Sequence, residues 1–150
     1  MQWPPHVTVG TIVEDQGKFL VIQEIIANKP VLHYPAGHLE FGESLIQAAK
    51  REALEETGWQ IDITHFLNIN QLYSQDENII YIHFNFVGNP VKKVDGLPSQ
   101  KAILAVDWLD FSSLKKQRHL MRTDRFFQSL EQFNQGQLFP LSIIHDEQFN

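Results

Sequence analysis

The stretch from Gly37 to Trp59, GHLEFGESLIQAAKREALEETGW, constrains the fold of this chain more than any other. Ser44 and Gln47 stand at the spacing of a capping box, in which each side chain bonds the backbone N–H of the other residue. A helix is therefore predicted to begin near Ser44. Gly58 follows the last predicted turn, where a left-handed C-cap favours glycine.

One face of this predicted helix is built from small or apolar side chains. A face that packs against a core repeats at steps of three and four residues. Four residues follow this rule: Ile46, Ala49, Ala53 and Thr57. Because two of the four are alanines, the helix is predicted to lie close to a sheet.

Three carboxylates border that face, and their spacing is costly for a helix. Glu52, Glu55 and Glu56 fall within one turn, and like charges at such spacings repel by about 0.2–0.5 kcal/mol for each exposed pair. A hard divalent cation relieves this repulsion, because such ions prefer oxygen ligands. Three glutamates taken alone favour a solvated acidic helix face over a metal site, and the residues around them reverse that preference.

These glutamates belong to a longer pattern, G-x5-E-x7-R-E-x-x-E-E-x-G, formed by Gly37, Glu43, Arg51, Glu52, Glu55, Glu56 and Gly58. The pattern resembles the signature of the Nudix hydrolases, enzymes that cleave a nucleoside diphosphate linked to another group. Two hydrophobic positions hold Ala53 and Trp59, where the family usually has an aliphatic residue. That difference concerns packing and leaves the charged positions complete.

The resemblance implies an α/β fold, a Nudix-type α/β/α sandwich with a mixed β-sheet, and hydrolysis that depends on Mg²⁺, with Mn²⁺ as a substitute. It implies metal ligation by Glu52, Glu55, Glu56 and the Gly37 carbonyl. The catalytic residues implied are Glu52, Glu56, Arg51 and Glu43. Arg51 is predicted to pair with Glu43 across the junction of loop and helix. The general base stays open between Glu52, Glu56 and a loop residue, and the number of metal ions stays open between one and three.

The rest of the chain alternates strand and turn signals before two helical segments. Strands are predicted at His6–Val13, Lys18–Ile26, Val31–Tyr34, Ile79–Val87 and Ala102–Leu109, with one or two more inside Gln60–Tyr73. A loop is predicted over Gly88–Lys101, and helices at Asp110–Arg118 and Thr123–Gln135. The continuously apolar FLVI segment predicts that the second strand is covered on both faces. Strands flanked by helices favour a mixed sheet between helical layers.

The strand Ile79–Val87 alternates most regularly, which places Tyr81 and His83 on the opposite face from Ile80, Ile82, Phe84 and Phe86. Tyr81 and His83 are candidate substrate-binding residues. Packing against another layer explains the same pattern, and the sequence leaves the two readings even.

Composition limits the function classes. A chain of 150 residues that is 43% hydrophobic is expected to form one domain, residues 1–150. It has no cysteine, which excludes disulfides and thiol catalysis and is consistent with a cytoplasmic location. A net charge of -6 disfavours nucleic acid as a partner. No signal peptide and no apolar run of about 18 residues is present, so no membrane partner is expected.

Further segments, PHVTV, GKFLV, PAGHLE and the terminal FPL, resemble the bacterial NudJ-type phosphatases within the Nudix family. This implies a small nucleoside or pyrimidine di- or triphosphate as substrate, including the thiamine-pathway pyrimidine diphosphate, with orthophosphate released. The alternatives are a MutT-like or ADP-ribose-type pyrophosphatase and a non-catalytic nucleotide sensor. Monomer and homodimer both stay open, as do the base and the physiological substrate.

Overall fold

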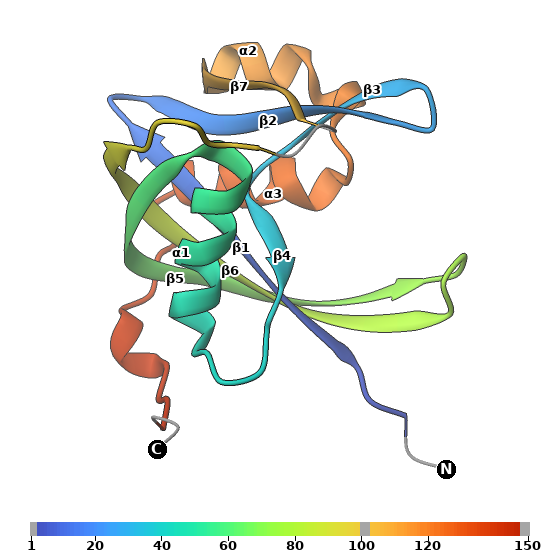
Figure 1. Ribbon diagram of the computed structural model, residues 1–150, viewed down its shortest axis with the longest axis vertical. Helices are drawn as coiled ribbons and strands as arrows, with labels where there is room; N and C mark the ends of the chain where they lie inside the picture. The colour runs from blue at the N-terminus through green and yellow to red at the C-terminus, as the bar shows by residue number, and fades with distance from the viewer. Residues whose placement is uncertain (1–2, 100–102, 148–150) are drawn as a thin grey trace.

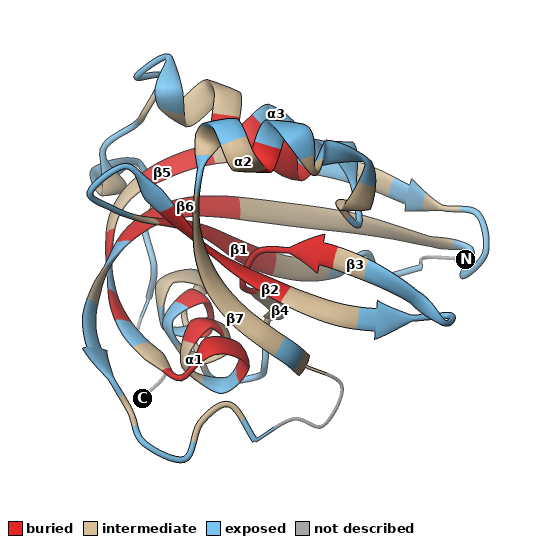
Figure 2. Ribbon diagram, turned by 90° about the horizontal axis from the view of Figure 1, so that it is seen from above, coloured by how far each residue is buried: buried red, intermediate tan, exposed pale blue. Residues whose placement is uncertain are grey.

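The structure is a computed structural model that describes residues 3–99 and 103–147. A mixed β-sheet stands between helix α1 (Leu45–Thr57) on one face and helices α2 (Phe111–Lys116) and α3 (Asp124–Asn134) on the other (Figures 1 and 2). The α/β/α sandwich predicted from the sequence is confirmed.

Strand β1 (His6–Asp15) organises one half of the sheet. It runs parallel to β6 (Ile79–Lys93) and antiparallel to the short β4 (Ala36–His38). β5 (Trp59–Ser74) pairs with β6 in antiparallel register along nearly its whole length. Because β4 is held against β1, the chain entering α1 has a fixed position relative to the sheet.

Strand β2 (Lys18–Ile26) begins the other half. A tight turn joins it to β1, and the two strands pair at only two positions before they diverge. β2 then pairs with β3 (Lys29–His33) and β7 (Ile103–Asp110), both antiparallel. The β2–β3 hairpin and the β5–β6 hairpin therefore extend from separate halves of the sheet, and in Figure 1 both point to the right.

The sheet has a hydrophobic core on each face. Phe19 and Val21 of β2 pack into the core beneath α3, and Leu20 packs into the core beneath α1. All three side chains are buried, so the predicted covering of this strand on both faces is confirmed.

Helix α1 lies close to the sheet because its inner face is made of small side chains. Ala49, Ala53 and Thr57 are buried as predicted, and Ala48 joins them. Ile46 is only partly buried and packs at the edge of the same core.

Helix α3 is amphipathic, as the sequence predicts. It buries Phe126, Phe127 and Leu130, and Phe133 packs against them at the rim of the core. The one-turn 3-10 helix η1 (Arg118–Leu120) connects α2 to α3.

The largest departure from the predicted strands concerns β6. It continues through Lys93 against β5, so the predicted loop is wrong over residues 88–93. Asn89 and Pro90 suggested a turn, but beyond Gly88 the strand pairs with β5 alone among the described residues. Proline is tolerated on such an edge. The end of that predicted loop, residues 100–101, and the predicted strand start at Ala102 lie outside the described residues.

Other differences are smaller. The segment from Gln60 to Tyr73 lies in one strand, β5, whose register shifts at three places. β4 was not predicted, because its three residues are too few for an alternating pattern. The tail contains the 3-10 helix η2 (Leu141–Ile143). Among the described residues, no helix has the length and apolar character needed to cross a membrane.

Candidate active site

Both ends of α1 are fixed by the residues that predicted them. The Ser44 hydroxyl accepts a bond from the Gln47 N–H at 3.1 Å, and the Gln47 side chain accepts from the Ser44 N–H at 2.8 Å. Gly58 has a φ of 76° and donates its N–H to the Leu54 carbonyl at 2.9 Å. The predicted helix boundaries are confirmed, and the carboxylates between them have fixed directions.

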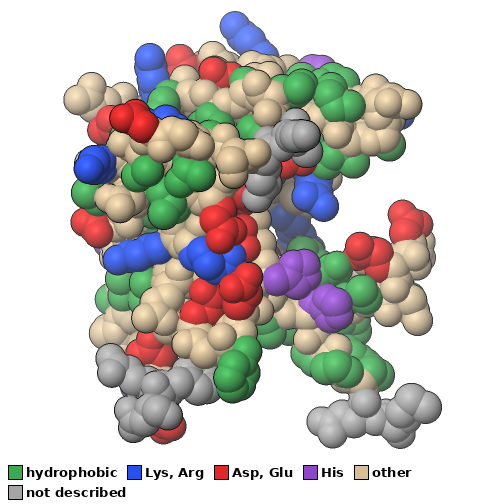
Figure 3. All heavy atoms as spheres, in the orientation of Figure 1, with side chains coloured by type: hydrophobic (Ala, Val, Ile, Leu, Met, Phe, Trp, Pro, Cys, Tyr) green, Lys and Arg blue, Asp and Glu red, His purple; other side chains and the backbone are tan. Residues whose placement is uncertain are grey.

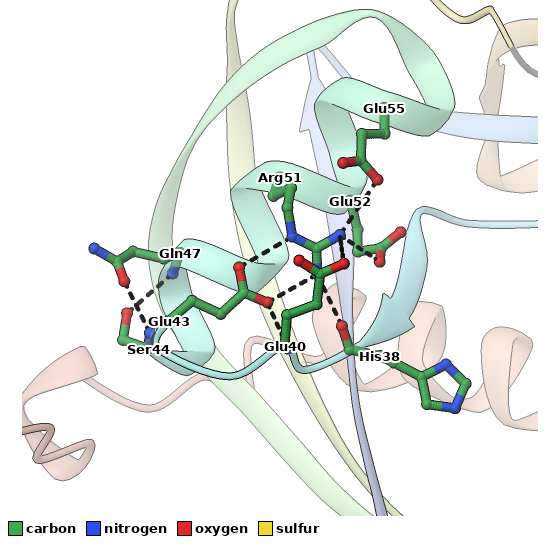
Figure 4. Close-up of polar contacts among 8 residues, drawn as sticks. All are labelled: His38, Glu40, Glu43, Ser44, Gln47, Arg51, Glu52 and Glu55. Carbon is green, nitrogen blue, oxygen red and sulfur yellow. Dashed lines mark hydrogen bonds and ion pairs between the residues drawn. The ribbon is translucent and has the colours of Figure 1, made fainter. Parts of the chain in front are cut away.

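Arg51 fastens the loop before α1 to the helix, as Figure 4 shows. Its Nε donates to Glu43 Oε2 at 3.0 Å and its Nη2 to Glu43 Oε1 at 2.8 Å. Nη2 also donates to the His38 carbonyl at 2.8 Å. The Glu43 side chain in turn accepts a bond from the Glu40 N–H at 2.8 Å. Hydrogen bonding to Arg51 lowers the pKa of Glu43, and the predicted Arg51–Glu43 pair is confirmed.

The same guanidinium also reaches the glutamate cluster. Nη1 donates to Glu52 Oε1 at 2.8 Å and to Glu55 Oε2 at 3.2 Å (Figure 4). These carboxylates, above all hydrogen bonding to Glu43, raise the pKa of Arg51. The sequence predicts that a metal ion relieves the repulsion among these glutamates. In the structure Arg51, on the same helix, already relieves part of it.

Glu52 lies directly against the backbone of β4. A methyl group built on Gly37 would stand 2.1 Å from the Glu52 carboxyl carbon, so any side chain at position 37 would displace this carboxylate. Partial burial raises the pKa of Glu52, and the bond from Arg51 opposes that rise. The structure therefore brings Gly37 and Glu52 together, as the metal site predicted from the family resemblance requires.

Glu56 is the most buried of the three motif glutamates, with 8% of its surface exposed. Its Oε1 accepts a bond from the Ala36 N–H at 2.8 Å. Burial, and to a smaller extent the charges of Glu52 and Glu24, raise its pKa to about 8. Glu55 is exposed and interacts with Arg51.

The donor set fits a hard divalent cation. Glu52 and Glu56 reach the β4 backbone from successive turns of α1. Glu55 is exposed and pairs with Arg51, and the described positions of the three motif glutamates do not bring an oxygen of each within 4.8 Å of the others. All the donors are oxygens, which Mg²⁺ and Mn²⁺ prefer. A cation at this position would also offset the cost of ionising the buried Glu56 carboxyl.

A cleft opens beside this cluster. Figure 3 shows the surface hollowed between the β2–β3 hairpin and the β5–β6 hairpin, with histidine side chains on its lower edge and acidic side chains to the left. One wall of the cleft carries three rings that pack edge to face: His6, His38 and Tyr81, with centroids 5.6–6.1 Å apart.

The two predicted substrate-binding residues have different surroundings. Tyr81 is partly exposed within that ring cluster, and its hydroxyl donates to Glu77 at 2.6 Å. His83 lies deeper. Its Nδ1 is 2.6 Å from the Thr8 hydroxyl, and its Nε2 is 2.8 Å from the Tyr34 hydroxyl. Burial lowers the pKa of His83.

His83 begins a polar network that sequence reasoning missed. Asn85 accepts from the Tyr34 hydroxyl at 2.6 Å and donates to Asn68 at 2.8 Å. Asn68 in turn donates to Gln132 of α3 at 2.9 Å. The network therefore ties the wall of the cleft to helix α3. Asn85 carried a sequence signal, because it alternates with Tyr81 and His83 along β6.

Two further charged residues near the cleft were also missed. Arg122 is exposed. Burial raises the pKa of Glu56 and the hydrogen bond to Glu77 raises that of Tyr81, and the Arg122 charge partly opposes both rises, which places it within electrostatic reach of the glutamate cluster and the β5–β6 hairpin. Glu24 lies beside Glu56 and His33. No motif marked either residue, since each depends on long-range folding.

With this geometry established, comparison with known proteins identifies the class. The NUDIX domain family matches residues 4–130. Phosphatase NudJ from Escherichia coli strain K12 is 34% identical over 142 residues, covering 95% of this chain and 92% of that protein. The chain therefore belongs to the Nudix hydrolase family.

Solved structures agree with this assignment. A NUDIX hydrolase from Nitrosomonas europaea superposes with a TM-score of 0.90 at 31% identity, covering 96% of this chain and 98% of the other. A MutT protein from Methanosarcina mazei Go1 superposes with a TM-score of 0.72 at 18% identity, covering 91% and 98% of the two chains, and supports the fold alone.

Proposed function

We propose that this Nudix hydrolase is a Mg²⁺-dependent phosphatase that cleaves phosphoanhydride bonds of nucleoside di- and triphosphates and releases orthophosphate. The carrying observation is the assembled motif, in which Glu52 and Glu56 converge on the β4 backbone at the edge of the cleft. The likeness to phosphatase NudJ over 95% of the chain supports the reaction type. The thiamine-pathway pyrimidine diphosphate belongs to the same proposed substrate class.

Glu52, Glu55, Glu56 and the Gly37 carbonyl would hold the cation, with Mn²⁺ as a substitute for Mg²⁺. Bound there, a divalent cation neutralises the diphosphate and lowers the pKa of a coordinated water. Arg51 and Glu43 keep the loop and the helix in register, because their two parallel bonds fix both the distance and the orientation of the carboxylates.

Proton acceptance is assigned to the two motif glutamates that face the β4 backbone. Glu52 accepts a hydrogen bond from Arg51 on one carboxylate oxygen, and Glu56 accepts one from the Ala36 N–H on one of its own. Among the described residues the second oxygen of each has no hydrogen bond, so it is free to accept the proton of an attacking water. Comparing Glu52→Gln with Glu56→Gln in single turnovers, at saturating metal, distinguishes the two.

The cleft supplies candidate contacts for the rest of the substrate. Tyr81 offers an aromatic face near the rim, and aromatic rings stack on nucleobases. Arg122 has no ion-pair partner within 4.0 Å among the described residues and its positive charge suits a phosphate. We assign His83 a supporting role, because its ring nitrogens already contact Thr8 and Tyr34.

Phosphate release tests the proposal. A panel of nucleoside di- and triphosphates and thiamine precursors is incubated with the protein in Mg²⁺ and, in parallel, in EDTA. Orthophosphate that appears only with Mg²⁺ supports the assignment. Pyrophosphate with a mononucleotide would instead identify a MutT-like or ADP-ribose-type pyrophosphatase, and tight nucleotide binding without turnover would identify a sensor. A cytoplasmic location stays a prediction from the cysteine-free sequence.

A further inference from the structure

Three ligand-type side chains meet where the β2–β3 hairpin reaches the end of α1. Glu24 is on β2, His33 ends β3 and Glu56 lies in the last turn of α1. One donor atom from each lies within 4.8 Å of the other two. In the β2–β3 register, His33 is opposite Ile22, so Glu24 is its diagonal neighbour on the same face. None of these residues except Glu56 belongs to the Nudix motif.

The tautomer of His33 is fixed by its backbone contact. Its Nδ1 lies 3.0 Å from the Tyr34 carbonyl oxygen, which can only accept, so Nδ1 carries the hydrogen. In the neutral ring, Nε2 then presents a lone pair. A histidine that gives its other N–H to a backbone carbonyl is the usual arrangement of a metal-ligating imidazole.

That lone pair is buried and accepts no hydrogen bond from any described residue. His33 is 7% exposed, and its Nε2 has no hydrogen bond among the described residues. Glu24 Oε1 lies 3.0 Å away, within ion-pair distance but outside hydrogen-bond geometry. Two acceptors this close repel unless a positive ion or a proton lies between them.

Glu56 adds a second carboxyl group as the third donor. Glu56 uses Oε1 for the Ala36 N–H, and its other oxygen has no bond among the described residues. Among the described residues, no lysine or arginine forms an ion pair with Glu24 or Glu56 within 4.0 Å. Buried carboxylates without a cationic partner are rare unless they bind a metal.

We propose that Glu24, His33 and Glu56 form a divalent transition-metal site, separate from the oxygen-only Mg²⁺ site of the motif but sharing Glu56 with it. The imidazole nitrogen selects Mn²⁺ or Zn²⁺ over Mg²⁺, because Mg²⁺ binds oxygen donors and rarely nitrogen. Metal binding at this site does not depend on the protein being a phosphatase. Only the link between the site and the reaction, through the shared Glu56, rests on the proposed function.

Mn²⁺ is the probe for this site, and the readout is electron spin-echo envelope modulation. The full chain is titrated with Mn²⁺ in excess Mg²⁺, so that Mg²⁺ fills the oxygen-only site. We expect ¹⁴N modulation from a directly bound imidazole in the wild type. His33→Gln should lose it and weaken Mn²⁺ binding by about ten-fold or more. His38→Gln is the matched control, because it removes a histidine of the same cleft and should keep the modulation.

The proposal is wrong if the wild type shows no ¹⁴N modulation at saturating Mn²⁺, or if His33→Gln keeps it. Should His33→Gln fail to fold by circular dichroism, Glu24→Gln decides, and unchanged Mn²⁺ affinity there also overturns the site. Phosphate release with Mg²⁺ alone is measured on the same samples. If the protein shows ¹⁴N modulation but releases no phosphate, the phosphatase proposal is wrong and the metal site stands. If it releases phosphate without ¹⁴N modulation, the metal site is wrong and the phosphatase proposal stands.

Discussion

The buried carboxyl of Glu56 makes the metal-free protein sensitive to pH. Its pKa is about 8 in the folded chain and 4.5 in the unfolded reference. A carboxyl that holds its proton more tightly when folded stabilises the fold at low pH. That contribution is complete below about pH 4.5 and is lost as the pH rises through about 8.

The size of this effect follows from the two pKa values. At about 1.4 kcal/mol per pH unit, the gap between 4.5 and about 8 gives an upper bound of about 5 kcal/mol. We expect about half, 2–3 kcal/mol, because the ionised carboxylate still accepts the Ala36 N–H and keeps some contact with water.

Glu56→Gln removes the charge and keeps the acceptor. The amide oxygen can still bond the Ala36 N–H, so the variant mimics the protonated acid. In EDTA we expect wild type and variant to agree within about 1 kcal/mol near pH 5, and the variant to be more stable by about 2–3 kcal/mol near pH 8. Urea unfolding followed by tryptophan fluorescence measures both values.

Glu55→Gln is the matched control, since Glu55 lies on the same turn but its side chain is 49% exposed. It should show no gain near pH 8. If Glu56→Gln keeps the wild-type pH dependence, or loses stability near pH 8, the carboxyl is not held in the buried, proton-retaining environment described above.

Three further results follow from the same site. Mg²⁺ should raise the melting temperature of the wild type by binding the folded state alone, and the gain should shrink in Glu52→Gln; an equal shift would place the metal elsewhere. Glu56→Gln should lose most phosphate release although its metal-free fold is intact, and activity within a few-fold of wild type would exclude Glu56 as ligand or base. Gly37→Ala should displace the Glu52 carboxylate and abolish the Mg²⁺ shift. Gly96→Ala meets nothing within 4 Å but places alanine at a φ of +80°, so it should lower the stability of the fold and still keep that shift.

Local signals explain which parts of the fold could be predicted. The capping box at Ser44 and the C-cap at Gly58 act within one turn of backbone, so sequence spacing alone located both ends of α1. Strand β2 was predictable because its apolar run must be covered on both faces. The Asn89–Pro90 pair misled, because a turn signal does not reveal whether the strand there has a partner on both edges.

The site residues show the same difference between local and long-range contacts. Arg51 and Glu43 belong to one short motif, and their contact followed from spacing. Glu24, Asn85 and Arg122 reach the cleft only through the pairing of β2 with β3, of β6 with β1, and of the segment after η1 with β3. A single sequence carries no record of such long-range contacts, so no spacing rule could locate these residues.

Arg51 gives the last prediction, because one guanidinium serves two opposing purposes. It braces Glu43 through two bonds, and it also bonds Glu52 at 2.8 Å, where it competes with a cation for that carboxylate. Arg51→Ala should therefore bind Mg²⁺ as tightly as wild type, or a few-fold more tightly. Its turnover should fall, since a misplacement of about 1 Å can cost on the order of 100-fold in rate. Arg51→Lys restores the charge but not the forked guanidinium, and should recover only part of the rate.

Isothermal titration measures the Mg²⁺ affinity of these variants, and phosphate release at saturating Mg²⁺ measures their turnover. Full activity in Arg51→Lys would show that charge alone matters there, and loss of Mg²⁺ binding in Arg51→Ala would show that the arginine assembles the ligands instead of competing for them.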